Sequence, residues 1–168
     1  MIPIDASAKF PTRCADMTDT TERFRLVTIG YQGRSLDELV RRLVRNEVRL
    51  LLDVRQIARS RRPEFNGTRI AAAAEKAAIR YRHVPLLGSS RRLRAHLFET
   101  RDFERFAGFY LAYVRRWRLA DVRAVASAAR REGTVAILCY ESDHTECHRD
   151  IVASEALRTH RKLEVLHL

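Results

Sequence analysis

Short hydrophobic runs alternate along this chain with longer segments in which apolar residues recur every three or four positions. Nearly continuous apolar runs are typical of strands buried on both faces of a sheet, whereas a spacing of three and four is typical of helices. The runs predict five strands, at residues 26–29, 48–54, 79–84, 134–138 and 163–168.

Helices are predicted between these strands. Ser35, with Glu38 three residues on, forms a capping box for the first helix, and Thr68 is predicted to cap an alanine-rich helix that runs to Ala78. The remaining expected segments are an arginine-rich loop at 86–92, an aromatic helical region at about 102–131 and a last helix in whose first turn Cys147 lies.

This alternation predicts an α/β fold, in which a mostly parallel sheet of about five strands carries helices on both faces as a single three-layer domain. A chain of 168 residues is long enough for one such domain with a core of its own. Residues 1–24 have no sustained period and are predicted to form a flexible extension, in which Cys14 is incidental. The domain is expected to span residues 25–168.

Charge and cysteine content narrow the class of protein. The chain has 32 Lys and Arg against 21 Asp and Glu, and all but three of the cations are arginine. Arginine favours bidentate contacts with phosphate or carboxylate, although a genome rich in G and C also raises its use. Three separated cysteines argue against a secreted disulfide framework. No run reaches the length of a membrane span, so the protein is expected to be cytoplasmic and not to act at a membrane.

Candidate chemistry lies where the predicted strands end, because ligands of open α/β sheets bind beyond the carboxyl ends of the strands. The fourth strand ends at Cys139 and is followed by Cys147, His148 and Arg149. The start of a helix stabilises an anion, so either a thiolate at Cys147 or a bound phosphate would suit it. Cys139 could instead be a small buried hydrophobe.

Polar residues also follow the first three strands. Asp53 could act as a general acid or base, or could only orient Arg55 through an ion pair. A dense group of arginines after the second strand is predicted to contact phosphate, unless nearby acids compensate it. The residues expected to bind substrate are Tyr31, Arg55, Arg59, Arg61, Arg62, His83, Arg91 and Arg149.

Taken together, these segments resemble the DUF488 family, over almost the whole chain from Val27 to Leu168. The resemblance is carried by the segments 28–36, 52–55, 60–66, 81–88, 138–139 and 146–149. It implies an α/β fold and a cysteine-bearing site. Members of the family often carry a histidine where this chain has Tyr31.

A fainter, architectural similarity is to rhodanese-like domains, which pair an Asp-Val-Arg after an early strand with a nucleophilic cysteine after a later one. Here Asp53, Val54 and Arg55 precede Cys139 in that order. The loop 140–146 differs, because it is long and carries three acids that would raise the pKa of a neighbouring thiol.

Two functions of different class remain open. The first is an enzyme, a thiol- or carboxylate-dependent hydrolase or transferase, acting on a phosphate-bearing substrate such as a nucleotide or nucleic acid. The second is a nucleotide- or nucleic-acid-binding module with structural or redox-sensing cysteines, for which a disulfide between Cys139 and Cys147 is conceivable. The catalytic residues of the enzyme would be Asp53, Cys139, Cys147 and His148.

The cysteine and histidine spacing predicts no metal site. Cys139, His144, Cys147 and His148 could be assembled into one, but no closed pattern such as paired C-x-x-C occurs. The pattern indicates no particular cofactor.

Overall fold

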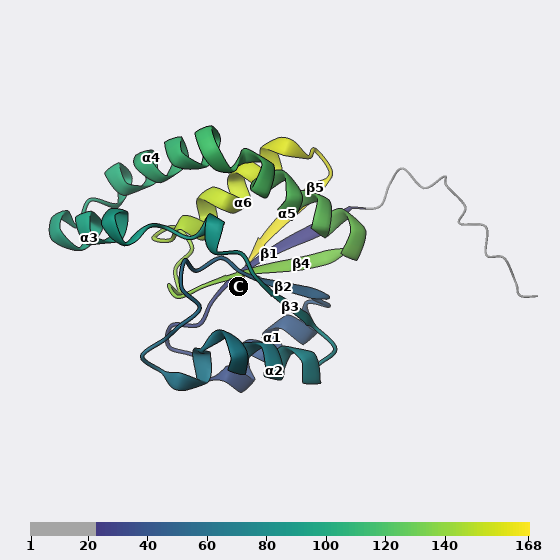
Figure 1. Ribbon diagram of the computed structural model, residues 1–168. Helices are drawn as coiled ribbons and strands as arrows, with labels where there is room; N and C mark the ends of the chain where they lie inside the picture. Colours follow the sequence, from purple (N-terminus) through teal and green to yellow (C-terminus); the bar gives the residue numbers. More distant parts are fainter. Residues whose placement is uncertain (1–22) are drawn as a thin grey trace, which may run out of the picture.

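The computed structural model describes residues 23–168, and within them a single sheet of five strands forms the centre of the protein (Figure 1). All the strand pairs are parallel, and the strand order across the sheet is β3-β2-β4-β1-β5. This confirms the α/β prediction. The strands are β1 (Phe24–Gly30), β2 (Leu50–Asp53), β3 (Arg80–His83), β4 (Thr134–Cys139) and β5 (Leu163–His167).

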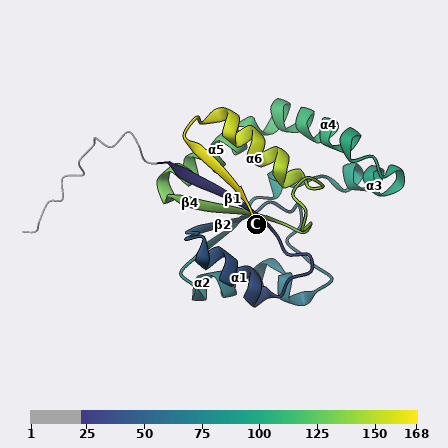
Figure 2. The ribbon, with the colours of Figure 1, turned by 180° about the vertical axis from the view of Figure 1, so that it is seen from behind.

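Helices cover both faces of this sheet, as Figures 1 and 2 show from opposite sides. One face carries α1 (Leu36–Arg45) and α2 (Gly67–Lys76). The other carries α3 (Arg91–Thr100), α4 (Phe103–Tyr113), the π-helical turn η3 (Val114–Arg118), α5 (Leu119–Glu132) and α6 (His148–Thr159). Two short 3-10 turns, η1 (Pro63–Phe65) and η2 (Pro85–Leu87), follow β2 and β3.

Alternation along the strands divides the interior into two hydrophobic clusters. Successive side chains of a strand point to opposite faces, so Leu26 packs beneath α5 and α6 whereas its neighbour Val27 packs on the side of α1 and α2. Ala136 and Ile137 divide in the same way on β4. Every residue of β4 is buried, which explains its unbroken apolar sequence.

Most of the predicted elements occur, with differences at their ends. Ser35 Oγ accepts a hydrogen bond from the Glu38 amide at 3.1 Å, which confirms the cap of α1. The cap at Thr68 is wrong, because Asn66 is the residue before α2 and Thr68 lies inside the helix. β1 begins at Phe24, one residue inside the predicted extension, and Cys14 lies outside the described residues.

The largest error in the predicted elements concerns α3. The prediction assigned Arg91 and Arg92 to a loop, but a helix begins at Arg91, after Ser90, whose hydroxyl accepts from the Leu93 amide at 3.2 Å. None of the ten residues of α3 is buried, and its contact with the core is limited to the partly buried Leu93 and Leu97, an apolar pattern too short to reveal the helix.

Candidate functional site

The loop that follows β4 is held close to the end of β1. Gly30 makes this approach possible, because a Cβ atom placed there would lie 1.6 Å from the backbone oxygen of Glu141. The Gln32 amide donates to the Tyr140 carbonyl at 2.8 Å, and the buried Arg149 donates to the carbonyls of Glu141 at 2.6 Å and Ser142 at 3.0 Å. Contacts from β1 and α6 therefore fix the position of Glu141.

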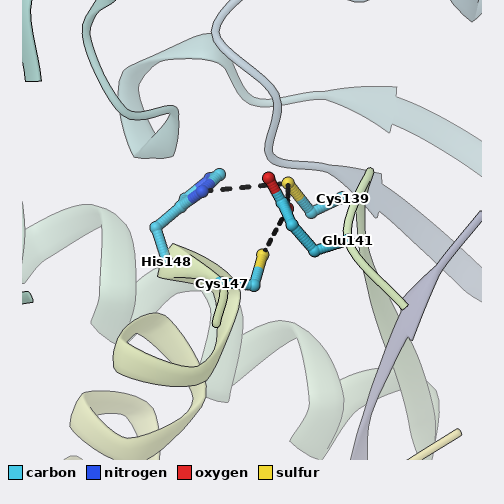
Figure 3. Close-up of side chains that lie close together, drawn as sticks. All are labelled: Cys139, Glu141, Cys147 and His148. Carbon is cyan, nitrogen blue, oxygen red and sulfur yellow. Dashed lines mark hydrogen bonds between the residues drawn. The ribbon is translucent and has the colours of Figure 1, made fainter. Parts of the chain in front are cut away.

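Four side chains meet between this loop and the start of α6, and we call them the Cys/Glu/His cluster: Cys139, Glu141, Cys147 and His148 (Figure 3). Both thiols donate to the same oxygen of Glu141, Cys139 at 3.1 Å and Cys147 at 2.8 Å. The Nδ1 atom of His148 lies 3.8 Å from the sulfur of Cys139. The structure thus brings together three of the four predicted catalytic residues.

The imidazole of His148 is fixed from its other side. Its Nε2 atom lies 3.1 Å from the carbonyl oxygen of Val54, directly after β2, and the edge of the ring contacts Tyr110, with ring centroids 5.2 Å apart. Because a carbonyl only accepts hydrogen bonds, Nε2 carries a proton and Nδ1 faces the thiols. Burial opposes a charge on this ring, but the contacts with Cys147, the Val54 carbonyl and Glu141 outweigh it and raise the pKa of His148.

Burial and hydrogen bonding together set the pKa values of the side chains in this cluster. Burial raises the pKa of the Cys147 thiol well above its ordinary value of 9.0, and the neighbouring Cys139 raises it further. Burial also opposes ionisation of Glu141, but the hydrogen bonds from Cys147, its own backbone and Cys139 outweigh it and lower the pKa of this carboxyl. At neutral pH Glu141 is therefore a carboxylate, and Cys147 is a protonated thiol.

The sequence predicted that Cys147 lies in the first turn of the last helix. In the structure Cys147 is instead the N-cap residue of α6. The pKa of the Cys147 thiol is raised, which is the direction expected from the acids of the loop 140–146, but burial is the largest cause of the rise. The helix start therefore does not produce a thiolate here.

Asp53 and Arg55 form a separate, buried network next to the cluster. The guanidinium of Arg55 binds both carboxylate oxygens of Asp53, at 2.8 and 2.5 Å, and donates to the Tyr31 hydroxyl at 3.1 Å and the Phe65 carbonyl at 2.9 Å. Tyr81 donates to Asp53 at 2.7 Å. Of the two roles predicted for Asp53, these contacts match the ion pair with Arg55. The ion pair also fixes the segment that contains Val54, whose carbonyl orients His148.

The other residues predicted to bind substrate are dispersed. Arg59, Arg61 and Arg91 are exposed, whereas Tyr31 is buried and stacked on Phe65, with ring centroids 4.3 Å apart. Among the rest, Arg62 pairs with Glu64 at 2.9 Å, His83 Nε2 lies 2.8 Å from the Arg55 carbonyl, and Arg149 is buried in the loop contacts described above.

A pocket of about 370 Å³ opens over the Cys/Glu/His cluster. Glu141 and His148 contribute to its lining, and the opposite wall comes from α3 and the start of α4. The remaining residues that line it are Gln32, Ser89, Arg94, Leu97, Phe98, Arg101, Phe103, Phe106, Tyr140 and Glu146.

Sequence reasoning did not identify Glu141 or most of this wall as part of a site. Phe98 and Tyr140, which line this wall, are exposed. The available signal was Phe98, an exposed aromatic residue next to Leu97, which packs against the core.

A second group of possible ligands was also missed, because its members are far apart in sequence. His144 Nδ1 lies 2.9 Å from Asp150, and the rings of His144 and His167 are stacked with centroids 3.6 Å apart. His167 comes from the end of β5.

The fold and the site define a class: an α/β protein with one parallel sheet and a buried thiol, carboxylate and imidazole cluster at the carboxyl ends of its strands. The family model described as "Domain of unknown function DUF488" matches residues 35–156, and the chain belongs to this family. This confirms the resemblance noted in the sequence. No curated protein and no solved structure matches the chain. Within residues 23–168, no helix has the length and apolar character needed to cross a membrane.

Proposed function

We propose that this protein is an enzyme that hydrolyses a nucleotide or a nucleotide unit of a nucleic acid in the pocket above the Cys/Glu/His cluster. The single observation that carries the proposal is that an ionised, half-buried carboxylate, Glu141, lines the pocket while the thiols that hold it in place are buried. A carboxylate held at the wall of a ligand pocket lies where a general base can reach a water molecule and a bound substrate.

The lining of the pocket supports a nucleotide. Phe98, Phe103 and Tyr140 offer ring faces or edges against which a nucleobase can pack, and Arg94 and Arg101 offer charged donors for phosphate. Arg94 is already oriented by the carbonyl of Ser89 and by Gln56, whose side-chain oxygen lies 3.5 Å away. A flat ring joined to an anionic group is therefore the ligand class that fits this lining best.

In the proposed reaction Glu141 accepts a proton from a water molecule. The water oxygen forms a bond to the electrophilic atom of the substrate, the bond to the leaving group breaks, and the proton passes from Glu141 to the leaving group. Cys139 and Cys147 keep Glu141 in place by donating to it. Asp53 and Arg55 support the site indirectly, through the segment that contains Val54.

The second candidate is a nucleotide-binding module without turnover. It is favoured by one observation, the lowered pKa of Glu141, which makes this carboxylate a weaker base. In this case the same pocket would bind the ligand, and the adjacent thiols would have a structural or redox-sensing role.

Product formation from a panel of nucleotides and short oligonucleotides, followed by mass spectrometry, separates the two candidates. The enzyme is expected to convert at least one member of the panel, and Glu141→Gln is expected to reduce turnover about 100-fold or more while the ligand still binds. Glu99→Gln is the matched control, because it removes an exposed carboxylate of α3 that does not line the pocket. Saturable binding with no product from any member would leave the binding module and overturn the enzyme.

A further inference from the structure

We propose that Cys139, Cys147 and His148 bind one thiophilic divalent cation, such as Zn²⁺, with Glu141 at the fourth position, on the side of the pocket. The inference deepens the proposed function and rests on it for the role of the ion in hydrolysis. The binding of the ion can be tested without any substrate.

The donor atoms are already close to the arrangement that such an ion needs. Tetrahedral zinc with sulfur, nitrogen and oxygen ligands has bonds of about 2.0–2.3 Å, so neighbouring ligand atoms lie about 3.3–3.8 Å apart. In the cluster, the Cys139 sulfur lies 3.8 Å from His148 Nδ1 and 3.1 Å from the Glu141 oxygen, and all four ligand atoms lie within 4.8 Å of one another. Small side-chain movements would bring them around one ion.

The surroundings of His148 are those of a metal ligand. A coordinating histidine usually donates its second ring N–H to a carbonyl or carboxylate, which fixes the tautomer and directs the free nitrogen to the metal. His148 meets this requirement, because its Nε2 lies against the Val54 carbonyl at 3.1 Å. Tyr110 packs against the ring and covers it from the interior.

Two cysteines and one histidine with an open or exchangeable fourth position form a ligand set of catalytic zinc sites. Glu141 is the most accessible of the four residues and faces the pocket, so it is the ligand that a water molecule can replace. The ion would lower the pKa of that water, and Glu141 would take its proton, which is the role proposed for this carboxylate above. The sequence spacing did not reveal the set, because its donors come from a strand end, a loop and a helix start.

The cluster of His144, Asp150 and His167 is the alternative position for a metal ion. It offers no sulfur, its residues are half-buried or exposed, and the Nδ1 atom of His167 is bound to the Thr28 hydroxyl at 2.9 Å. These donors serve as a control, because an ion there would not show sulfur coordination.

The test uses the full-length protein, reduced and freed of metal, and titrated with Co²⁺ and with Zn²⁺. We expect one ion per chain, sulfur-to-cobalt charge-transfer absorption with tetrahedral d–d bands, and release of protons as the thiols coordinate the ion. Cys147→Ser and Cys139→Ser should each weaken binding at least about tenfold and reduce the charge-transfer absorption. Glu141→Gln should retain that absorption but change the d–d bands, and His144→Asn should have no effect on either.

The outcomes distinguish this inference from the proposed function. Cobalt binding without charge-transfer absorption, or binding abolished by His144→Asn and not by Cys147→Ser, would overturn the cysteine site. If a serine variant fails to fold, the absorption of the wild-type protein and the Glu141→Gln spectrum still decide the matter. Turnover by metal-free protein would support the enzyme and reject the role of the ion in hydrolysis. Sulfur-bound cobalt without turnover of any nucleotide would support the metal site and reject the enzyme.

Discussion

At the scale of single residues, the reactivity of Cys147 is the sharpest consequence of the site. Burial raises the pKa of this thiol, and alkylating agents react with thiolates, so alkylation of the reduced, metal-free protein should be slow at neutral pH and accelerate only in the alkaline range. Mass spectrometry of intact protein, with Cys147→Ser to assign the signal, measures the rate. Rapid alkylation at neutral pH would contradict the protonated thiol and restore the thiol nucleophile.

The ion pair of Asp53 and Arg55 gives a second prediction. Asp53→Asn leaves the buried guanidinium of Arg55 without its carboxylate, which is expected to lower the free energy of unfolding by about 3–5 kcal/mol. Urea denaturation measures the loss. The exposed pair of Arg62 and Glu64 is the control, and Glu64→Gln should have a much smaller effect. If Asp53→Asn and Glu64→Gln lowered the free energy of unfolding equally, the buried ion pair would contribute no more to stability than the pair at the surface.

Single residues also show which features of the site could be predicted from the sequence and which could not. Their place at strand ends predicted that Asp53, Cys139, Cys147 and His148 lie at one edge of the sheet, because parallel strands bring their carboxyl ends together. The pattern could not decide between the two roles of Asp53, since an aspartate two positions before an arginine is compatible with both. It also could not show that Glu141 accepts from both thiols, because the loop has no periodicity from which its path follows.

At the scale of elements, the approach of the β1 end to the loop after β4 should be sensitive to one methyl group. Gly30→Ala places a Cβ atom against the Glu141 backbone, so it is expected to displace the loop, lower stability by about 1–3 kcal/mol and weaken metal binding. Urea denaturation and the cobalt titration measure these effects.

Gly108→Ala is the matched control for this substitution. Gly108 lies within α4 with nothing within 4 Å of its added Cβ, and alanine is the better helix former, so stability should rise by up to about 1 kcal/mol. Normal metal binding by Gly30→Ala would contradict the role of this contact in placing Glu141.

The elements were predicted unevenly, for a physical reason. β4 has buried residues on both faces, so its sequence is apolar throughout and the strand was evident. α3 lies over the pocket and has no buried residue, so only Leu93 and Leu97 mark a helical stripe; the first two residues of α3 were assigned to a loop and the rest to no element. The wall of the candidate pocket was therefore the part of the fold that hydrophobic patterning could not reveal.

At the scale of the whole molecule, the raised pKa of Cys147 predicts how stability changes at high pH. An acid whose pKa is raised by folding contributes stability that is fully present below its unfolded value, here the ordinary 9.0, and is lost as pH rises toward the folded value. The reduced, metal-free protein should therefore lose about 1.4 kcal/mol per pH unit from this group above that value.

Cys147→Ser separates this loss from that of other groups, because Tyr81 and Tyr110, whose pKa values burial also raises, remain in both proteins. Urea denaturation at several alkaline pH values should show the stability advantage of the wild type over the variant decreasing with pH. A difference that stays constant across this range would mean that the thiol ionises as readily in the folded chain as in the unfolded one.

The central claim is that the pocket over the Cys/Glu/His cluster binds a nucleotide. The affinity of the protein for a nucleoside monophosphate tests this claim most directly. Calorimetry on the wild type, Arg101→Asn and Arg92→Gln compares two exposed arginines, of which Arg101, the C-cap residue of α3, lines the pocket and Arg92, within α3, does not. Asparagine tolerates the positive φ of 56° at position 101, so the substitution removes the charge without straining the backbone. We predict saturable binding that Arg101→Asn weakens at least about tenfold and Arg92→Gln leaves nearly unchanged. Equal weakening by both variants, or no saturable binding by the wild type, would contradict a nucleotide site in this pocket.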